Sequence, residues 1–388
     1  MTKPPWTSLL MLATAVLASF PAAADLEALW RAHRVEAYRP PPPEELARAE
    51  ALFLRTLAGP AAPGLAADWA ALGFDLRPLD DDARRLWVLA EQPRRRDGRG
   101  LFALAGDPAG RLYLQAPHSF KDLHTGRIGL RLFAEGAFAA GAWNTVPRRY
   151  TDEDEDPVQA DMAHHEASYL EPFTRALVRH QPQALTLQLH GFAGGSRRSA
   201  AARGAGFIVS AGSTRASVAA EALTRCLADR FGAPALLYPR DTRELGGTRN
   251  RIGRILRAAG NEGFLHLEAA LAIRQRLRDD AGSRRRLLIT LLLLPGLLLI
   301  RSSANELDVV QLELLRQYPL PLRWDNIEGR PLWLDGQAPR AAPLTTDGWR
   351  ERGEDDMHYS GDLHGVRLAP GEWIRVRLPR EARLRLER

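Results

Sequence analysis

Apolar positions between residues 96 and 286 follow two alternating periods. Short apolar runs, bounded by polar and turn residues, predict strands at 111–116, 184–192, 207–212, 235–239 and 263–270. Stretches with helical periodicity lie between and after them, at 122–136, 160–180, 217–231 and 271–280. Strands that alternate with helices of this length predict an α/β domain with a wound, mainly parallel sheet. Reactive side chains are then expected at the carboxyl ends of the strands.

The segments on either side of this domain have other patterns. Residues 25–95 are rich in Ala, Leu and Arg and predict a helical N-terminal arm, broken by the prolines at 40–43 and by 60–64. Residues 287–300 form an apolar run with Pro295 and Gly296 at its centre, which favours two buried strands joined by a turn. A short membrane-associating hairpin is the less favoured alternative. The rest of 287–388 alternates apolar and polar residues between turns, which indicates a small C-terminal β-rich module.

The first 24 residues have the three parts of a secretory signal peptide. Lys3 gives a positive start, an apolar stretch runs over 9–20, and three alanines precede a predicted cut after Ala24. The apolar stretch is shorter than the ~20 residues that span a bilayer, so an uncleaved anchor is the alternative rather than the first interpretation. We therefore expect a periplasmic or secreted protein.

The charge and the cysteine content exclude further classes of protein. The 388 residues carry a net charge of +6, but acidic runs such as 152–156 lie among the arginines, so the excess predicts no nucleic-acid partner. Cys226 is the only cysteine, which excludes an intrachain disulfide, and its helical surroundings favour a buried structural thiol.

Two histidines follow predicted strands and suggest a metal site. His118 ends the first strand, with Asp122 or His124 a few residues later, and His190 ends the second. Two imidazoles and one carboxylate from separate strand ends are the usual protein ligands of a catalytic zinc. A single histidine at a strand end is more often structural, so the hypothesis depends on the set as a whole.

Further polar residues could complete a catalytic site. Glu268 ends a strand that should be buried, where a carboxylate needs a partner or a task such as general base. Asn144 and Arg148 could orient a substrate carboxylate or polarise a carbonyl. Asp161 with His164 is expected at the rim of the site. The plain alternatives are a salt bridge with an arginine for Glu268 and solvated surface charge for Arg148.

The order of these residues resembles the N-formylglutamate amidohydrolase family and, more distantly, the zinc carboxypeptidases. The resemblance covers about 115–278 and depends on 117–119, Asn144 with Arg148, 189–190, 244–248, and 267–268 followed by Arg274. It implies a phosphorylase/hydrolase-like α/β fold over 96–286, zinc ligands at His118 and His190, an acidic ligand at or near Asp122, and Glu268 as general base. The carboxypeptidase pattern has its acidic ligand at the position of Lys121, so Asp122 and His124 both stay open for that role.

These features together predict an exported zinc-dependent amidohydrolase or peptidase. It would hydrolyse amide bonds next to a carboxylate, through metal-activated water and a Glu general base, in peptide-like or acyl-amino-acid substrates, peptidoglycan-derived ones among them. The alternatives are a non-catalytic envelope protein that binds ligands with the same fold, and an interaction protein whose function lies in 287–388.

Overall fold

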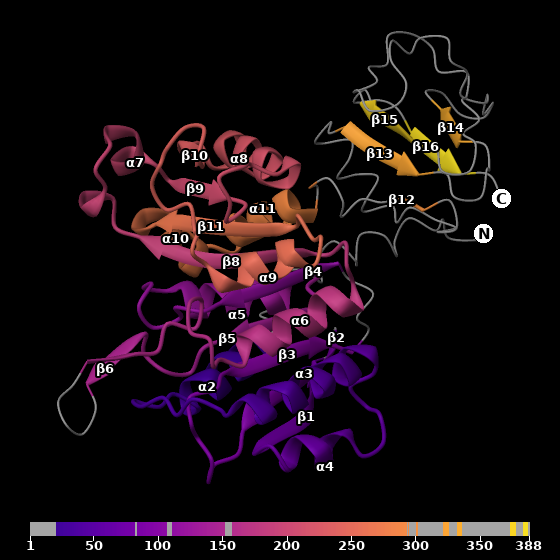
Figure 1. Cartoon of the computed structure of the whole chain (residues 1–388). Coiled ribbons are helices and arrows are strands. Elements are labelled where there is room, and N and C mark those ends of the chain that lie inside the picture. Colours follow the sequence, from indigo (N-terminus) through magenta and orange to yellow (C-terminus); the bar gives the residue numbers. More distant parts are fainter. Residues whose placement is uncertain are drawn as a thin grey trace, which may run out of the picture.

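The computed structural model describes residues 21–81, 84–106, 111–151, 157–292, 294, 300–301, 321–325, 332–335, 373–377 and 383–386. Its main feature is a nine-stranded sheet with the strand order β1-β2-β3-β5-β4-β8-β11-β9-β10 (Figure 1). The strands are β1 (Phe74–Asp81), β2 (Arg84–Glu91), β3 (Leu101–Ala105), β4 (Leu112–Ala116), β5 (Ala140–Trp143), β8 (Leu185–Phe192), β9 (Phe207–Ser210), β10 (Ala235–Leu237) and β11 (Phe264–Ala270).

The centre of the sheet is parallel and its flanks are mixed. Strands β5, β4, β8 and β11 run in one direction, so their carboxyl ends lie at one edge. Strands β1, β2 and β3 pair antiparallel on one side, and β9 pairs antiparallel with β11 on the other. The predicted α/β class is confirmed, and the parallel pairs are those of the central strands and of β9 with β10.

Helices cover both faces of the sheet because both faces of the central strands are apolar. One face packs against α2 (Pro21–Ala32), α5 (Thr125–Glu135), α8 (Val218–Phe231), α10 (Leu271–Asp279) and α11 (Ala281–Leu292). The other packs against α3 (Pro43–Ala58), α4 (Leu65–Ala70), α6 (Leu170–His180) and α9 (Arg251–Ala258). Three shorter elements, η2 (Gly194–Ser196), α7 (Ala200–Gly204) and the hairpin of β6 (Arg149–Thr151) with β7 (Pro157–Gln159), lie in the connections.

The N-terminal arm is not helical throughout. Residues 25–32, 43–58 and 65–70 are helical, but 74–81 and 84–91 form β1 and β2, which extend the sheet instead of covering it. The run from Leu86 to Ala90 is too short and too evenly apolar to distinguish a buried strand from a helix by its period. Pairing with β3 decides in favour of the strand.

The predicted helix at 160–180 begins ten residues late. Residues 160–169 form turns around Asp161, whose backbone carbonyl accepts the N–H groups of His164 and His165. Helix α6 starts at Leu170 and has Pro172 in its first turn, where proline is tolerated because that N–H has no intrahelical partner. That proline was the available signal for the helix start.

The predicted strand pair at 287–300 is wrong for its first part. Residues 287–292 end α11, and Leu287 and Leu291 are buried in the core, so the first part of the apolar run is helical. Pro295 and Gly296 lie outside the described residues. In the part of the chain that the structure describes, no helix has the length and apolar character needed to cross a bilayer.

Five short strands are described beyond residue 299. Strands β12 (Ile300–Arg301), β13 (Pro321–Asp325) and β15 (Trp373–Arg377) form one sheet, and β14 (Leu332–Asp335) pairs with β16 (Arg383–Leu386). Most of the predicted C-terminal module, and residues 1–20 of the predicted signal peptide, lie outside the described residues.

Candidate metal centre

A single tight turn after β4 brings His118 and Asp122 together. The backbone N–H groups of Lys121 and Asp122 donate to the carbonyl of His118 at 3.0 and 2.9 Å, which closes one helical turn. Residues four apart on such a turn project to the same side. The spacing read from the sequence therefore has a structural cause.

Strand β8 adds His190 from the neighbouring carboxyl end. His190 follows the pattern Gln188-Leu189-His190, in which the leucine is fully buried and the two polar residues share the opposite face. The same pattern recurs on β11 as His266-Leu267-Glu268, and the register places Glu268 opposite His190. Two adjacent strands thus present a polar stripe at the edge where the His118 turn lies.

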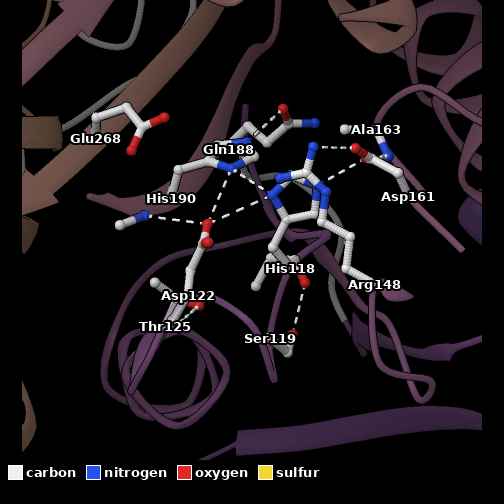
Figure 2. A network of polar contacts seen from close by, with 12 residues as sticks. His118, Ser119, Asp122, Thr125, Arg148, Asp161, Ala163, Gln188, His190 and Glu268 are labelled. Atoms are coloured by element: carbon white, nitrogen blue, oxygen red, sulfur yellow. Dashed lines mark hydrogen bonds and ion pairs between the residues drawn. The ribbon is translucent and has the colours of Figure 1, made fainter. Parts of the chain in front are cut away.

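Three ligand atoms form a compact triangle (Figure 2). His118 Nδ1 lies 3.1 Å from His190 Nδ1 and 3.4 Å from Asp122 Oδ2, and His190 Nδ1 lies 3.3 Å from the same oxygen. Tetrahedral ligands about 2.1 Å from a zinc ion are about 3.4 Å from one another. The triangle therefore has the dimensions of three zinc ligands with a fourth position open.

Hydrogen bonds on the far side of each ring turn the Nδ1 lone pairs toward this triangle. His190 Nε2 donates to Gln188 Oε1 at 2.9 Å, an oxygen that also accepts from the side-chain amide of Asn250. His118 Nε2 donates to Asp161 Oδ1 at 2.7 Å. A proton fixed on Nε2 leaves Nδ1 as the acceptor or ligand atom of a neutral imidazole.

The charges of the three groups also suit a cation. Burial lowers the pKa of His190, which keeps that ring neutral. Burial also acts to lower the pKa of His118, but the carboxylates of Asp122 and Asp161 outweigh it and raise that pKa to about 9. Burial would raise the pKa of Asp122, yet the two histidines hold it below its usual range, so the carboxylate is ionised. Arg148 already balances Asp161, so Asp122 is the carboxylate that a divalent ion would pair with once it replaces the proton on His118.

Two other groups of potential ligands fit a metal less well. In the group His118, Asp161 and His164, the guanidinium of Arg148 already lies 2.5 Å from Asp161 Oδ2, so a second cation would be repelled. In the group His190, His266 and Glu268, the two rings are only 30° from parallel with centroids 4.4 Å apart. A metal must lie in the plane of each imidazole that binds it, which such a stack prevents. The planes of the His118 and His190 rings cross at 70°, so one position can lie in both.

Glu268 lies beside the triangle and is not tied to it (Figure 2). The side chain is buried, and its Oε2 has no hydrogen-bond partner among the residues the structure describes. Burial, and secondarily the charge of Asp122, raise the pKa of Glu268 to about 8. At neutral pH the metal-free group is therefore largely protonated, and a metal ion nearby would favour the carboxylate form that accepts a proton.

His266 was missed from the sequence, although the alternation His266-Leu267-Glu268 places it on the same face as Glu268. Its ring packs against His190, and its Nε2 is 4.0 Å from Glu268 Oε1. Burial lowers the pKa of His266 well below its usual range, so the ring is neutral. Gly247, at φ +58°, closes the other side, because a Cβ there would be 2.8 Å from the ring.

The remaining predicted residues lie around the centre in roles that the sequence did not specify. Asp161 is bonded to His118 rather than standing at the rim, and it also contacts Arg148 and His164, the latter at 3.0 Å. Of the two alternatives for the acidic or second ligand, Asp122 joins the triangle, whereas His124 Nε2 faces the guanidinium of Arg278 at 2.9 Å.

Asn144 does not face the centre with its side chain. Its Oδ1 accepts the N–H of Ser119 at 2.7 Å, and its Nδ2 donates to the carbonyl of Val146. Both polar groups are thus used on the backbone, which differs from the expected contact with substrate. Asn144 holds the turn that carries His118.

No protein-family model matches this chain, and no curated protein matches it significantly. Among solved structures, it is similar to N-formylglutamate amidohydrolase from Ralstonia eutropha JMP134, with 14% identity and a TM-score of 0.34 over 50% of this chain and 96% of the other. It is also similar to an aspartoacylase family protein from Mesorhizobium loti MAFF303099, with 13% identity and a TM-score of 0.25 over 80% and 87% of the two chains.

The first of these structures bears the name of the family that the sequence motifs resemble. Both TM-scores are low, so the function proposed below depends on the geometry of the site. The more distant resemblance to zinc carboxypeptidases stays a prediction.

Proposed function

We propose that this chain is an exported zinc-dependent hydrolase that cuts amide bonds next to a carboxylate. The observation that carries the proposal is the triangle of His118 Nδ1, His190 Nδ1 and Asp122 Oδ2 with Glu268 free beside it. Three protein ligands and an open fourth position are typical of catalytic rather than structural zinc.

His118, His190 and Asp122 would hold the metal. When bound, zinc would act as a Lewis acid that polarises a carbonyl group and lowers the pKa of water. Asp161 and Gln188 orient the two imidazoles from behind through the hydrogen bonds to Nε2. Such outer partners fix the ring tautomer and strengthen the ligand.

Glu268 is assigned the proton transfers. Its carboxylate takes a proton from the attacking water as the new bond between water oxygen and carbonyl carbon forms. It then delivers that proton to the amide nitrogen as the carbon–nitrogen bond breaks, which releases a carboxylic acid and an amine. A single residue serves in both steps because the proton it gains in the first is the one it loses in the second.

Arg148 is the proposed anchor for charge on the substrate. Asp161 holds its guanidinium by the ion pair at 2.5 Å, and 30% of its side chain stays exposed. An arginine fixed in this way can bind a carboxylate with little loss of side-chain freedom. Together with the predicted signal peptide, this favours peptide-like or acyl-amino-acid substrates of the cell envelope, peptidoglycan-derived peptides among them.

The experiment is metal analysis combined with hydrolysis assays on the purified protein. The wild type should contain about one zinc per chain, and His190→Ala should contain far less while keeping its circular dichroism spectrum. A panel of N-acyl amino acids and short peptides should be hydrolysed by the wild type, lose hydrolysis on chelation and regain it with zinc. A folded wild type that binds zinc and hydrolyses nothing would favour a non-catalytic envelope binding protein, and one that binds no zinc would refute the proposal.

A further inference from the structure

The first helix of the described chain lies against the turn that carries two of the candidate ligands. The indole N–H of Trp30, in α2, donates to the backbone carbonyl of Asn144 at 3.0 Å. Its ring stacks on Phe120 with centroids 4.7 Å apart and planes 12° from parallel. Phe120 stands between His118 and Asp122 in the sequence, so Trp30 contacts the ligand turn itself.

A second connection runs through Asn144 to the residue after His118. Trp30 fixes the backbone of Asn144, and the Asn144 side chain accepts the N–H of Ser119 at 2.7 Å. Both hydrogen bonds are buried, so water does not compete for their donors and acceptors. The chain of contacts therefore leads from α2 to the backbone of the ligand turn in two steps.

The approach of α2 depends on a glycine at the start of α5. A Cβ at Gly126 would lie 2.6 Å from the Trp30 ring and 2.8 Å from Ser119 Cβ. One helical turn earlier on α2, Glu27 pairs with Arg127 at 2.6 Å. The helix is thus attached both to the turn and to the helix that follows it.

We propose that Trp30 is a positioning residue of the metal centre, which holds the His118–Asp122 turn in its ligand arrangement before metal binds. The inference assumes the proposed metal-binding function but adds a residue far from the ligands in sequence. A turn that is held in place in the metal-free protein binds metal more tightly, because less of the binding energy is used to order it. The predicted cut after Ala24 would leave this part of α2 intact.

The test compares two tryptophans that each donate one buried hydrogen bond. Trp30→Phe keeps an aromatic ring but removes the donor to Asn144 and part of the indole surface, a change that Trp69→Phe reproduces elsewhere in the fold. Trp69→Phe is the matched control, because Trp69 is buried in the other core and its indole donates to Thr56 Oγ1 at 2.9 Å, away from the ligand turn. Phe120→Ala gives a second test, since it removes the stacking partner at a partly exposed position.

Zinc affinity of the full-length chain is measured by competition with a chromophoric chelator, and the visible spectrum of the Co²⁺-loaded protein reports ligand geometry. We expect Trp30→Phe to bind zinc about fivefold more weakly than the wild type, the equivalent of one net hydrogen bond. Phe120→Ala should weaken binding by about the same factor through the lost ring stacking, and both variants should have an altered Co²⁺ spectrum. Trp69→Phe should lower thermal stability and leave zinc affinity and the spectrum unchanged.

Each result has a separate meaning. Equal zinc affinity in the wild type, Trp30→Phe and Phe120→Ala would overturn the inference and leave the metal centre standing. Equal weakening in Trp69→Phe would also overturn it, because the effect would then follow stability rather than position. A wild type without zinc would instead refute the proposed function on which the inference depends.

Discussion

The imidazoles of His118 and His190 meet through their Nδ1 atoms, 3.1 Å apart, while each Nε2 is bonded to an acceptor behind it. One ring comes from the turn after β4 and the other from the adjacent parallel strand β8, and their planes cross at 70°. Two nitrogen atoms that face one another at this distance need a proton or a cation between them. In the metal-free protein the proton on His118 takes this place, and a bound metal would replace it.

Asp161 is expected to strengthen metal binding through His118, in addition to holding Arg148 for the substrate. Asp161→Asn keeps an acceptor for His118 Nε2 but removes the charge that stabilises it, and zinc affinity should fall about tenfold or more, as for other outer-shell carboxylates. Isothermal titration with zinc measures the change. Asp279→Asn is the control, because that exposed carboxylate pairs with Arg278 outside the triangle and its loss should leave affinity unchanged.

Zinc binding should release about one proton at neutral pH. The pKa of His118 is raised to about 9, so below that pH the metal-free ring is protonated, while the lowered pKa values of His190 and Asp122 leave those groups ready to bind. Metal must displace the proton on His118, so affinity should increase about tenfold per pH unit from pH 7 until it levels near 9. Calorimetry in two buffers with different ionisation enthalpies counts the protons. Release of none would contradict the predicted charge state.

Replacement of Glu268 should separate catalysis from metal binding. Glu268→Gln has nearly the same volume and should retain zinc, yet hydrolysis should fall by about 10² to 10⁴, the usual contribution of a general base. Zinc content and kcat/KM are measured on the same preparation. Full activity in a zinc-loaded Glu268→Gln protein would exclude Glu268 as the base.

Gly247 provides a test of the packing behind the site. Gly247→Ala places an L side chain at φ +58° and a methyl group 2.8 Å from the His266 ring, whereas Gly232→Ala meets the same φ with nothing within 4 Å. The Gly232 variant should lose about 1 kcal/mol from the unfavourable backbone conformation alone. The Gly247 variant should lose about 1–3 kcal/mol more and also hydrolyse more slowly, because His266 is displaced against Glu268. Equal losses of unfolding free energy in urea titrations would show that the contact with His266 has no energetic consequence.

Much of the site could be predicted because its residues follow strands whose carboxyl ends meet at one edge of the sheet. His118, His190 and Glu268 each follow an apolar run, and the carboxyl ends of adjacent parallel strands β4, β8 and β11 bring them to one edge. Asp122 joins them because it is one helical turn from His118. Local spacing and sheet direction are both readable from the sequence.

The missed features depend on contacts between distant segments. Asp161 reaches His118 only because 160–169 turns instead of forming a helix, and Asn144 faces the backbone of Ser119 rather than the centre. The sequence predicts helix where β1 and β2 lie. A short apolar run fits a helix or a strand equally well, and pairing with a neighbouring strand decides which of the two forms. His266 alone had a local signal, since it alternates with Glu268 along β11.

The most direct test of the metal centre is a crystal structure of the zinc-loaded protein with anomalous diffraction data collected across the zinc absorption edge. We predict one strong anomalous peak about 2.0–2.2 Å from His118 Nδ1, His190 Nδ1 and Asp122 Oδ2. Glu268 should lie beside that ion without binding it. A peak coordinated through other residues or through Nε2, or no peak in a well-ordered crystal, would contradict the account.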